Sequence, residues 1–176
     1  YRAGRRAEGT ACTKSGGGSN ASPQSFDEIY GDIEFIASLT NTEKKGKELV
    51  DSMKKEVEKV KAIGDKIADK KNVYFEIGAG SGLYTFGNGT FLNELIETVG
   101  AKNIFGNESS WITVTPEAVI DANPDVILVN TPGTNEAGLT AIEDVESRDG
   151  WDTITAVQNG AVYSIDNNAS SRPSQN

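Results

Sequence analysis

The sequence contains no histidine and a single cysteine, Cys12. These shortages exclude a Ser-His-Asp triad, a Cys-His pair and the usual Cys/His zinc sites, and one cysteine cannot form an internal disulfide bond. No run of 18 apolar residues is present either, so we expect no segment that crosses a membrane. The 176 residues leave room for one domain with a full core, with or without tails.

Basic side chains are scarce in the second part of the chain. Residues 72–176 carry three basic side chains against fourteen acidic ones, a net charge of about −11. Because such a surface repels phosphate backbones, we expect no nucleic-acid partner. The same charge disfavours strongly anionic small ligands, unless Arg172 binds them locally.

Residues 1–25 are rich in Gly, Ser, Ala and Arg and show no hydrophobic periodicity, which indicates a disordered tail or linker. The sequence Gly-Thr-Ala-Cys that ends at Cys12 is similar to the end of a bacterial lipoprotein signal, in which the cysteine is lipidated. The eight residues before it are polar, although an apolar stretch should precede such a cysteine. A lipoprotein remnant and an unrelated tail therefore both remain open.

Residues 26–71 are predicted to be helical, with Ser25 as the cap and acidic residues in the first turn. Apolar side chains recur at three- and four-residue steps on both sides of a break near residues 40–42. We expect a long helix laid against a globular body. A coiled coil is less favoured because two heptad-like turns and Gly64 do not make a zipper.

Residues 72–176 alternate between strand and helix patterns. Strands are expected at residues 73–77, 126–129 and 161–165, and helices at residues 90–99, 115–122 and 139–148. This alternation predicts an α/β lobe with a Rossmann-like parallel sheet flanked by helices. Ligands bind such sheets in the loops that follow the strands, which here are residues 78–89, 130–138 and 166–173.

The glycine-rich run Glu-Ile-Gly-Ala-Gly-Ser-Gly that begins at Glu76 follows the first expected strand. It resembles the cofactor loop of S-adenosylmethionine-dependent methyltransferases, in which glycines let the backbone approach the cofactor. In that family a helix begins directly after the last glycine, whereas residues 83–89 prolong the loop here. A methyltransferase is therefore the alternative function, and a purely structural glycine loop is the simpler explanation.

A second resemblance extends over most of the chain after residue 26. The helix at residues 26–40 is similar to the one that joins the two lobes of class III substrate-binding proteins of ABC importers, which bind cobalamin, haem and ferric siderophores. Seven further stretches resemble the second lobe of that family in the right order: residues 73–76, 83–96, 100–105, 111–130, 147–151, 156–163 and 166–173. The likeness is closest to cobalamin-binding members.

The resemblance implies roles for particular residues. The positions that match ligand contacts are Tyr84, Phe86, Trp111, Asn167, Asn168 and Arg172. Aromatic rings on loops suit a flat, mostly apolar macrocycle. Glu117 matches the surface glutamate that pairs with arginines of the membrane permease.

Each of these residues also has a purely structural explanation. One of Tyr84 and Phe86 could belong to the core, and Trp111 could cover the domain's own core. An acidic residue such as Glu117 is favourable at a helix N-terminus whether or not a partner exists. Arg172 could pair with Asp166.

The resemblance implies a binding protein rather than an enzyme, without catalytic residues, metal ligands or cofactor. It would capture a corrinoid, or a related siderophore or haem, and deliver it to an ABC permease on the extracellular side of the bacterial membrane, either lipoprotein-anchored or periplasmic. Compared with the family, the sequence reads as a truncated single lobe: a tail (1–25), an interlobe helical segment (26–71) and a C-terminal α/β lobe (72–176). An apolar helix face without a partner would favour a homodimer, and a simple dimerisation module over residues 26–67 is a third hypothesis.

Overall fold

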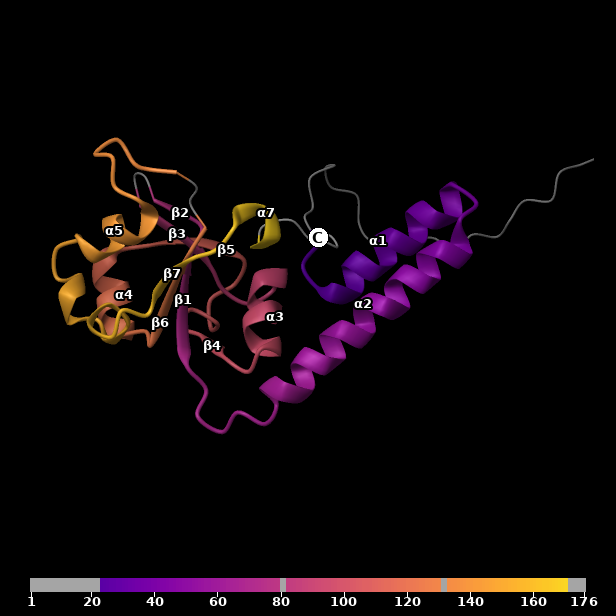
Figure 1. The fold of residues 1–176 in the computed structure, drawn as a ribbon, viewed down its shortest axis with the longest axis horizontal. Coiled ribbons are helices and arrows are strands. Elements are labelled where there is room, and N and C mark those ends of the chain that lie inside the picture. Colours follow the sequence, from indigo (N-terminus) through magenta and orange to yellow (C-terminus); the bar gives the residue numbers. More distant parts are fainter. Residues whose placement is uncertain (1–22, 80–81, 131–132, 171–176) are drawn as a thin grey trace, which may run out of the picture.

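The computed structural model describes residues 23–79, 82–130 and 133–170, and shows two helices followed by an α/β lobe (Figure 1). The first part comprises α1 (Phe26–Leu39) and α2 (Glu43–Gly64). The lobe comprises β1 (Asn72–Glu76), β2 (Gly78–Ala79), β3 (Leu83–Phe86), α3 (Phe91–Thr98), β4 (Lys102–Asn103), β5 (Trp111–Val114), α4 (Pro116–Ala122), β6 (Val126–Val129), α5 (Ala141–Glu146), the 3-10 turn η1 (Trp151–Thr153), α6 (Thr155–Gln158), β7 (Val162–Ser164) and α7 (Asn167–Ser170). The expectations for Cys12 and Arg172 lie outside the described residues.

The helical segment is a hairpin. The long helix expected from the sequence is present as α2, but α1 folds back along it so that the two lie side by side (Figure 1). The turn contains Asn41 in the left-handed region at φ 55°. Close approach of the helices requires Gly46, whose added Cβ would lie 2.5 Å from the Cβ of Ala37. Among the described residues, we find no helix that combines the length and the apolar character needed to cross a bilayer.

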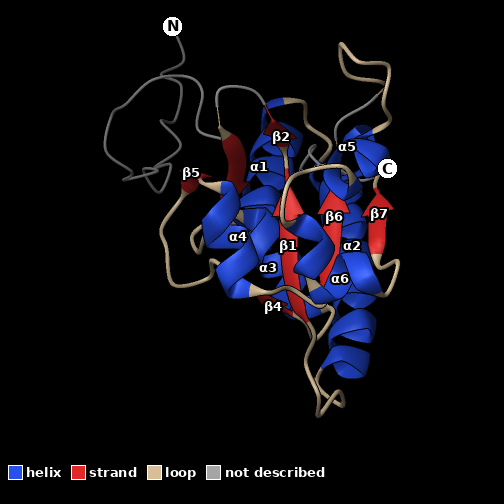
Figure 2. Cartoon of the chain, turned by 90° about the vertical axis from the view of Figure 1, so that its left-hand side faces the viewer, coloured by secondary structure: helices blue, strands red, loops and turns tan. Residues whose placement is uncertain are grey.

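The main sheet has the strand order β4-β1-β6-β7, with every neighbouring pair parallel, as the sequence predicted. In Figure 2 the arrowheads of β1, β6 and β7 point the same way, toward the end where β2 and α5 lie. Strand β1 is buried on both faces because its alternate side chains enter two different clusters. Tyr74 enters the cluster below α4 and α5, while Val73 and Phe75 enter the cluster below α3.

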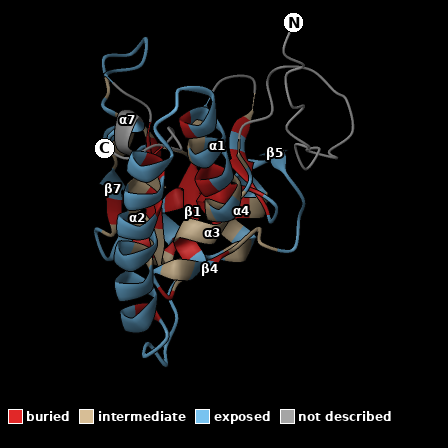
Figure 3. Cartoon of the chain, turned by 90° about the vertical axis from the view of Figure 1, so that its right-hand side faces the viewer, coloured by how far each residue is buried: buried red, intermediate tan, exposed pale blue. Residues whose placement is uncertain are grey.

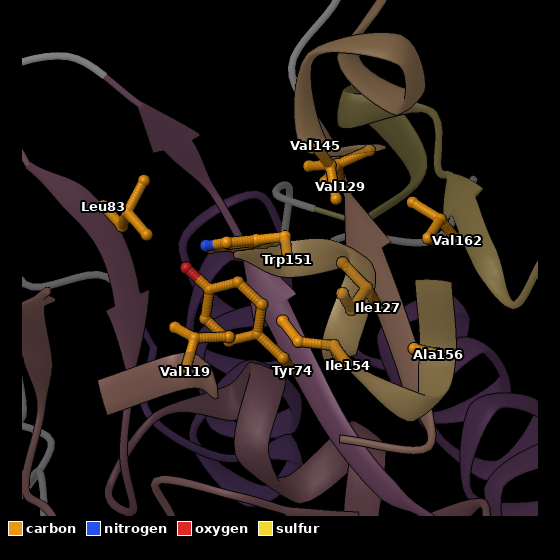
Figure 4. Close-up of a cluster of buried hydrophobic side chains, with 10 residues drawn as sticks. All are labelled: Tyr74, Leu83, Val119, Ile127, Val129, Val145, Trp151, Ile154, Ala156 and Val162. Atoms are coloured by element: carbon orange, nitrogen blue, oxygen red, sulfur yellow. The ribbon is translucent and has the colours of Figure 1, made fainter. Parts of the chain in front are cut away.

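Tyr74 and Trp151 form the centre of the larger cluster (Figure 4). Both side chains are fully buried, and their rings meet edge to face with centroids 6.2 Å apart. Aliphatic side chains from α4, α5 and β6 surround them, and these include Val119, Val145 and Ile127. The cluster therefore fastens β1 and β6 to the helices on one side of the sheet, and it fixes the ends of these strands.

The expectation that residues 78–89 form a glycine-rich loop was wrong for residues 78–79 and 83–86, which form strands. Strands β2, β3 and β5 make a second, antiparallel sheet in which Tyr84 pairs with Thr113 and Phe86 pairs with Trp111. The reason is local: the residues of β3 and β5 are mostly aromatic or β-branched, and such side chains favour strands when a partner strand is available. This small sheet stands where the parallel strand β1 ends.

Candidate functional site

Tyr84 and Trp111 lie on the same face of the antiparallel sheet. Tyr84 is opposite Thr113, and Trp111 is two residues from Thr113 on the same strand. Side chains two residues apart point to the same face, so the two aromatic residues are diagonal neighbours. Their exposed fractions are 44% and 49%. The structure thus brings together two half-exposed rings that are 27 positions apart in the sequence.

Phe86 is a correction to the sequence-based expectation. Its side chain is 0% exposed and packs against Phe75 and Trp111, with ring centroids 5.5 and 6.0 Å apart. The Phe86 ring meets the Trp111 ring edge to face, and because Phe86 is fully buried it cannot reach a ligand in this conformation. It is a core residue that supports Trp111.

Gly82, in the glycine-rich run of residues 76–82, has a structural explanation. A Cβ at Gly82 would lie 2.5 Å from Cγ2 of Thr113, so the close approach of β5 requires glycine there. Gly78 pairs with Tyr84, and a Cβ there would lie in ordinary van der Waals contact with the Tyr84 ring, 4.0 Å from Cδ2. A methyltransferase loop leads directly into a helix, whereas here a hairpin follows and α3 begins only at Phe91. The geometry does not support the methyltransferase alternative.

Polar groups gather at the ends of β6 and β7. Asn130, directly after β6, is 3% exposed and donates from Nδ2 to Oδ1 of Asn167 at 3.5 Å. Asn167 begins α7, so the last loop lies beside the end of β6 as the parallel topology requires. The sequence interpretation missed Asn130, although its position after a buried strand was a usable signal. The side chain of Asn168 lies outside the described part of the structure.

Glu117 is exposed in the first turn of α4. The backbone N–H of Glu117 and the Thr115 hydroxyl lower the pKa of its carboxyl group. The side chain therefore stays ionised at neutral pH, on an exposed residue. Such a group is available to a basic partner, although its placement also fits the helix dipole alone.

A buried ion pair links the end of β1 to α5. Arg148 donates from Nη1 and Nη2 to Oε2 and Oε1 of Glu76, at 2.7 and 2.8 Å, and from Nη2 to Oδ2 of Asp144 at 2.6 Å. The guanidinium also lies 4.6 Å from the Trp151 ring centroid. Burial lowers the pKa of Arg148, but the two carboxylates outweigh burial and raise it above its ordinary value. Sequence reasoning could not find this pair because 72 residues separate its members.

Two hollows are found at opposite ends of the sheet. One of about 460 Å³ lies at the carboxyl end and is lined by Glu76, Ala79, Gly133, Thr134, Asn135, Glu136, Leu139, Ala141 and Asp144. A larger one of about 650 Å³ lies at the amino end, near Lys70 and Lys102. Ligand sites on parallel sheets lie at the carboxyl end, so the smaller hollow is the relevant one.

No metal centre is apparent in the described ranges, where no three acidic, His or Cys side chains are grouped to hold an ion. What the carboxyl end offers is rigid aromatic area, amide groups and a hollow. Together with the parallel sheet, these features define an α/β binding lobe.

The comparisons with known proteins agree with this class. The family model described as "Periplasmic binding protein" matches residues 17–169, and the chain belongs to this family. Members of the family are substrate-binding proteins of ABC transporters, which are not enzymes, and they work on the extracellular side of the membrane.

Two similar proteins come from Bacillus subtilis (strain 168). The ABC transporter substrate-binding lipoprotein YvrC is 37% identical over 145 residues, which cover 81% of this chain and 44% of YvrC. The Fe(3+)-citrate-binding protein YfmC is 23% identical over 141 residues, which cover 80% of this chain and 43% of YfmC. The chain thus spans less than half the length of either relative.

Solved structures show the same fold. A possible iron-binding (periplasmic solute-binding) protein from Staphylococcus epidermidis superposes with a TM-score of 0.76 at 35% identity, over 86% of this chain and 58% of that one. A protein of the Fe3+-hydroxamate transport system from Saccharomonospora viridis gives 0.72 at 25% identity, over 90% and 53%. The similarity covers both the helical hairpin and the lobe, because each match includes most of the chain.

Proposed function

We propose that this chain is one lobe of the substrate-binding component of an ABC importer, and that it captures its ligand on the face formed by Tyr84 and Trp111. The observation that carries the proposal is the pair of half-exposed aromatic rings on one face, with the buried Phe86 packed edge to face against Trp111. Exposed rings held rigidly lose little entropy when a flat ligand stacks on them. Asn167, Asn168 and Arg172 would add polar contacts from the last loop.

The proposed ligand is a corrinoid, a flat macrocycle with uncharged amide groups at its rim. Charge favours it over a polyanionic chelate, because residues 72–170 hold fourteen acidic and only two basic side chains. Of those two, Arg148 is engaged by two carboxylates, and Lys102 lines the hollow at the other end of the sheet. Without histidine, haem would need a tyrosine as its axial ligand, which disfavours haem.

An iron–siderophore complex is the second candidate. The names of the similar proteins favour it, since they mention iron, ferric citrate and ferric hydroxamate. Among these chelates, an uncharged ferric hydroxamate suits the acidic lobe better than anionic ferric citrate does.

Titration calorimetry on the full-length protein tests the proposal, with cyanocobalamin, a neutral ferric trihydroxamate, haem and ferric citrate as probes. We expect binding of cyanocobalamin, weakened about tenfold by Tyr84→Ala and by Trp111→Ala. The matched control is Tyr163→Ala, since Tyr163 is 52% exposed on the edge strand β7. Binding of the ferric hydroxamate alone would show that the ligand is an iron–siderophore complex and not a corrinoid. Absence of binding heat with every probe would contradict ligand capture.

The remaining assignments follow the same proposal. Residues 1–25 would form a linker anchored through a lipidated Cys12, residues 26–71 the interlobe segment, and residues 72–176 the second lobe. Glu117 would dock on arginines of the permease. Glu117→Lys should then reduce ligand uptake in cells without changing ligand affinity, whereas Asp121→Lys, the same charge change at the other end of α4, should not.

A further inference from the structure

The loop between β6 and α5 makes little apolar contact with the rest of the lobe. Of residues 133–140, all but the half-buried Leu139 are exposed. Burial of apolar surface therefore does little to hold this loop in one conformation. Yet the loop supplies most of the lining of the 460 Å³ hollow at the carboxyl end of the sheet.

Asn135 closes the loop on itself. Its Oδ1 accepts hydrogen bonds from the backbone N–H groups of Ala137 and Leu139, at 2.9 and 3.0 Å. Its own backbone N–H donates to the carbonyl oxygen of Leu139 at 2.9 Å. Its Nδ2 donates to Oδ1 of Asp144 at 2.6 Å, which ties the closed loop to α5.

Arg148 connects Asp144, and through it the loop, to the main sheet. Asp144 accepts through Oδ2 from Nε and Nη2 of Arg148, and the same guanidinium pairs with both oxygens of Glu76 at the end of β1. Glu76 is 2% exposed, and Trp151, whose ring lies 4.6 Å from the guanidinium carbon, is fully buried. The guanidinium of Arg148 is therefore held by two groups that belong to the buried part of the lobe. A series of contacts thus runs from Glu76 at the end of β1 through Arg148 and Asp144 to Asn135. We call this series the relay.

From this geometry we infer that Arg148 and Asn135 are positioning residues that hold loop 133–140 as a pre-formed wall of the ligand site. The hollow reaches Ala79 of β2, and β2 pairs with β3, which carries Tyr84, so the loop borders the hairpin with the aromatic face. A loop that is already ordered costs less entropy when ligand binds. The inference rests on the proposed function for the ligand, but the ordering of the loop can be tested without any ligand.

Arginine is specifically required in this relay. A planar fork with several N–H groups can serve two carboxylates at once and stack on an indole ring. A lysine at position 148 keeps the positive charge but has a single ammonium group and no planar face. Arg148→Lys therefore preserves the charge of the site and removes its geometry.

Hydrogen exchange on the full-length protein measures the loop directly. In Arg148→Lys we expect the amides of Ala137 and Leu139 to exchange about tenfold faster, because the loop opens more often, while the β6 amide of Ile127 stays protected. Glu146→Gln is the matched control, since it removes an exposed acid from the same helix outside the relay. Unchanged exchange at Ala137 and Leu139 in Arg148→Lys would overturn the inference.

A double-mutant cycle with cyanocobalamin connects the loop to binding. Arg148→Lys and Asn135→Ala should each raise the dissociation constant about tenfold, and the double variant should be little worse than either single one. If the two effects on the dissociation constant instead multiply in the double variant, the two residues act independently and a shared relay is contradicted. Asn135 is exposed, so its alanine variant leaves the core intact. If no corrinoid binds, the proposed ligand is wrong, while the exchange experiment still decides the role of Arg148.

Discussion

The helical hairpin and the α/β lobe differ in how far they bury their large apolar side chains. On the hairpin, Phe35, Ile36 and Leu39 remain 60–68% exposed, whereas the lobe buries large side chains such as Tyr74 and Trp151 completely. Figure 3 shows this contrast, with buried residues concentrated around the sheet and α2 largely exposed. The lobe therefore contains its own core, while the hairpin presents an apolar face that suits a partner surface.

The two regions meet at a narrow junction between the ends of α2 and α3. A Cβ at Gly64 would lie 2.5 Å from the carbonyl oxygen of Thr98, and a Cβ at Gly100 would lie 2.5 Å from the carbonyl oxygen of Gly64. A second contact joins the start of α1 to α3, where the backbone N–H of Phe26 donates to Oε2 of Glu94 at 2.7 Å. The attachment thus depends on backbone contact and a few polar bonds more than on a shared core.

The largest expected effect comes from core truncation in the lobe. Trp151→Ala should lower the free energy of unfolding by about 3–5 kcal/mol, because the cavity lies among fully buried residues. Ile63→Ala on α2, where the side chain is 66% exposed, should change it by less than about 0.5 kcal/mol. Urea denaturation, monitored by circular dichroism, measures both free energies of unfolding. Similar losses of stability in the two variants would contradict the difference between the lobe and the hairpin.

A smaller effect is expected at the junction. Gly64→Ala should cost about 1–3 kcal/mol, because the added methyl group meets backbone atoms that cannot move away cheaply. Gly31→Ala in α1 is the control: nothing lies within 4 Å of the added Cβ, so the helix should gain up to about 1 kcal/mol. Thermal unfolding compares the two, and a stabilised Gly64→Ala variant would show that the junction is looser than its geometry indicates.

The apolar face of the hairpin should govern self-association of the 176-residue chain. We expect light scattering to give a mass near twice 18.7 kDa, and Phe35→Ser together with Leu39→Ser to return it to 18.7 kDa. Tyr163→Ser removes a half-exposed aromatic side chain from the lobe and should leave the dimer intact. A monomeric parent chain would contradict the homodimer and leave the face to another partner.

The smallest effect concerns the capping box that begins α5. The backbone N–H and the hydroxyl of Thr140 lower the pKa of Glu143 below its ordinary value near 4.5. Because the folded-state pKa is the lower one, the stabilisation is fully present above pH 4.5 and is lost as the pH falls through the folded-state pKa. The stability advantage over Glu143→Gln should therefore shrink in acid, as urea denaturation at a series of pH values would measure. A constant difference down to acidic pH would contradict this account.

Local features of the lobe could be predicted from the sequence because short-range chemistry fixes them. The expected helix at residues 115–122 is present as α4, capped by the Thr115 hydroxyl and with Pro116 at its first position. Asn123 ends it in the left-handed region at φ 43°, and Gly100 terminates α3 at φ 80°. The buried strand that follows α4 was equally clear from its continuous apolar run.

The candidate site was only partly predictable. The sequence identified Tyr84 and Trp111 as candidates, but it could not separate Tyr84 from Phe86, since both are aromatic residues on one strand face. Tertiary packing made the difference, because it buries Phe86 against Phe75 and Trp111 and leaves Tyr84 half exposed. The relay through Arg148 left no trace in the sequence, because its members are far apart and common in type.

The sequence by itself determined the parallel α/β architecture, the approximate limits of α3 and α4 and the acidic character of the lobe, since each depends on periodicity, capping or composition within a few residues. Only the tertiary structure decided that residues 78–86 form a hairpin with β5, that α1 folds back on α2, and that Glu76 meets Arg148. Those outcomes depend on which distant surfaces bury one another, and that is a property of the whole chain.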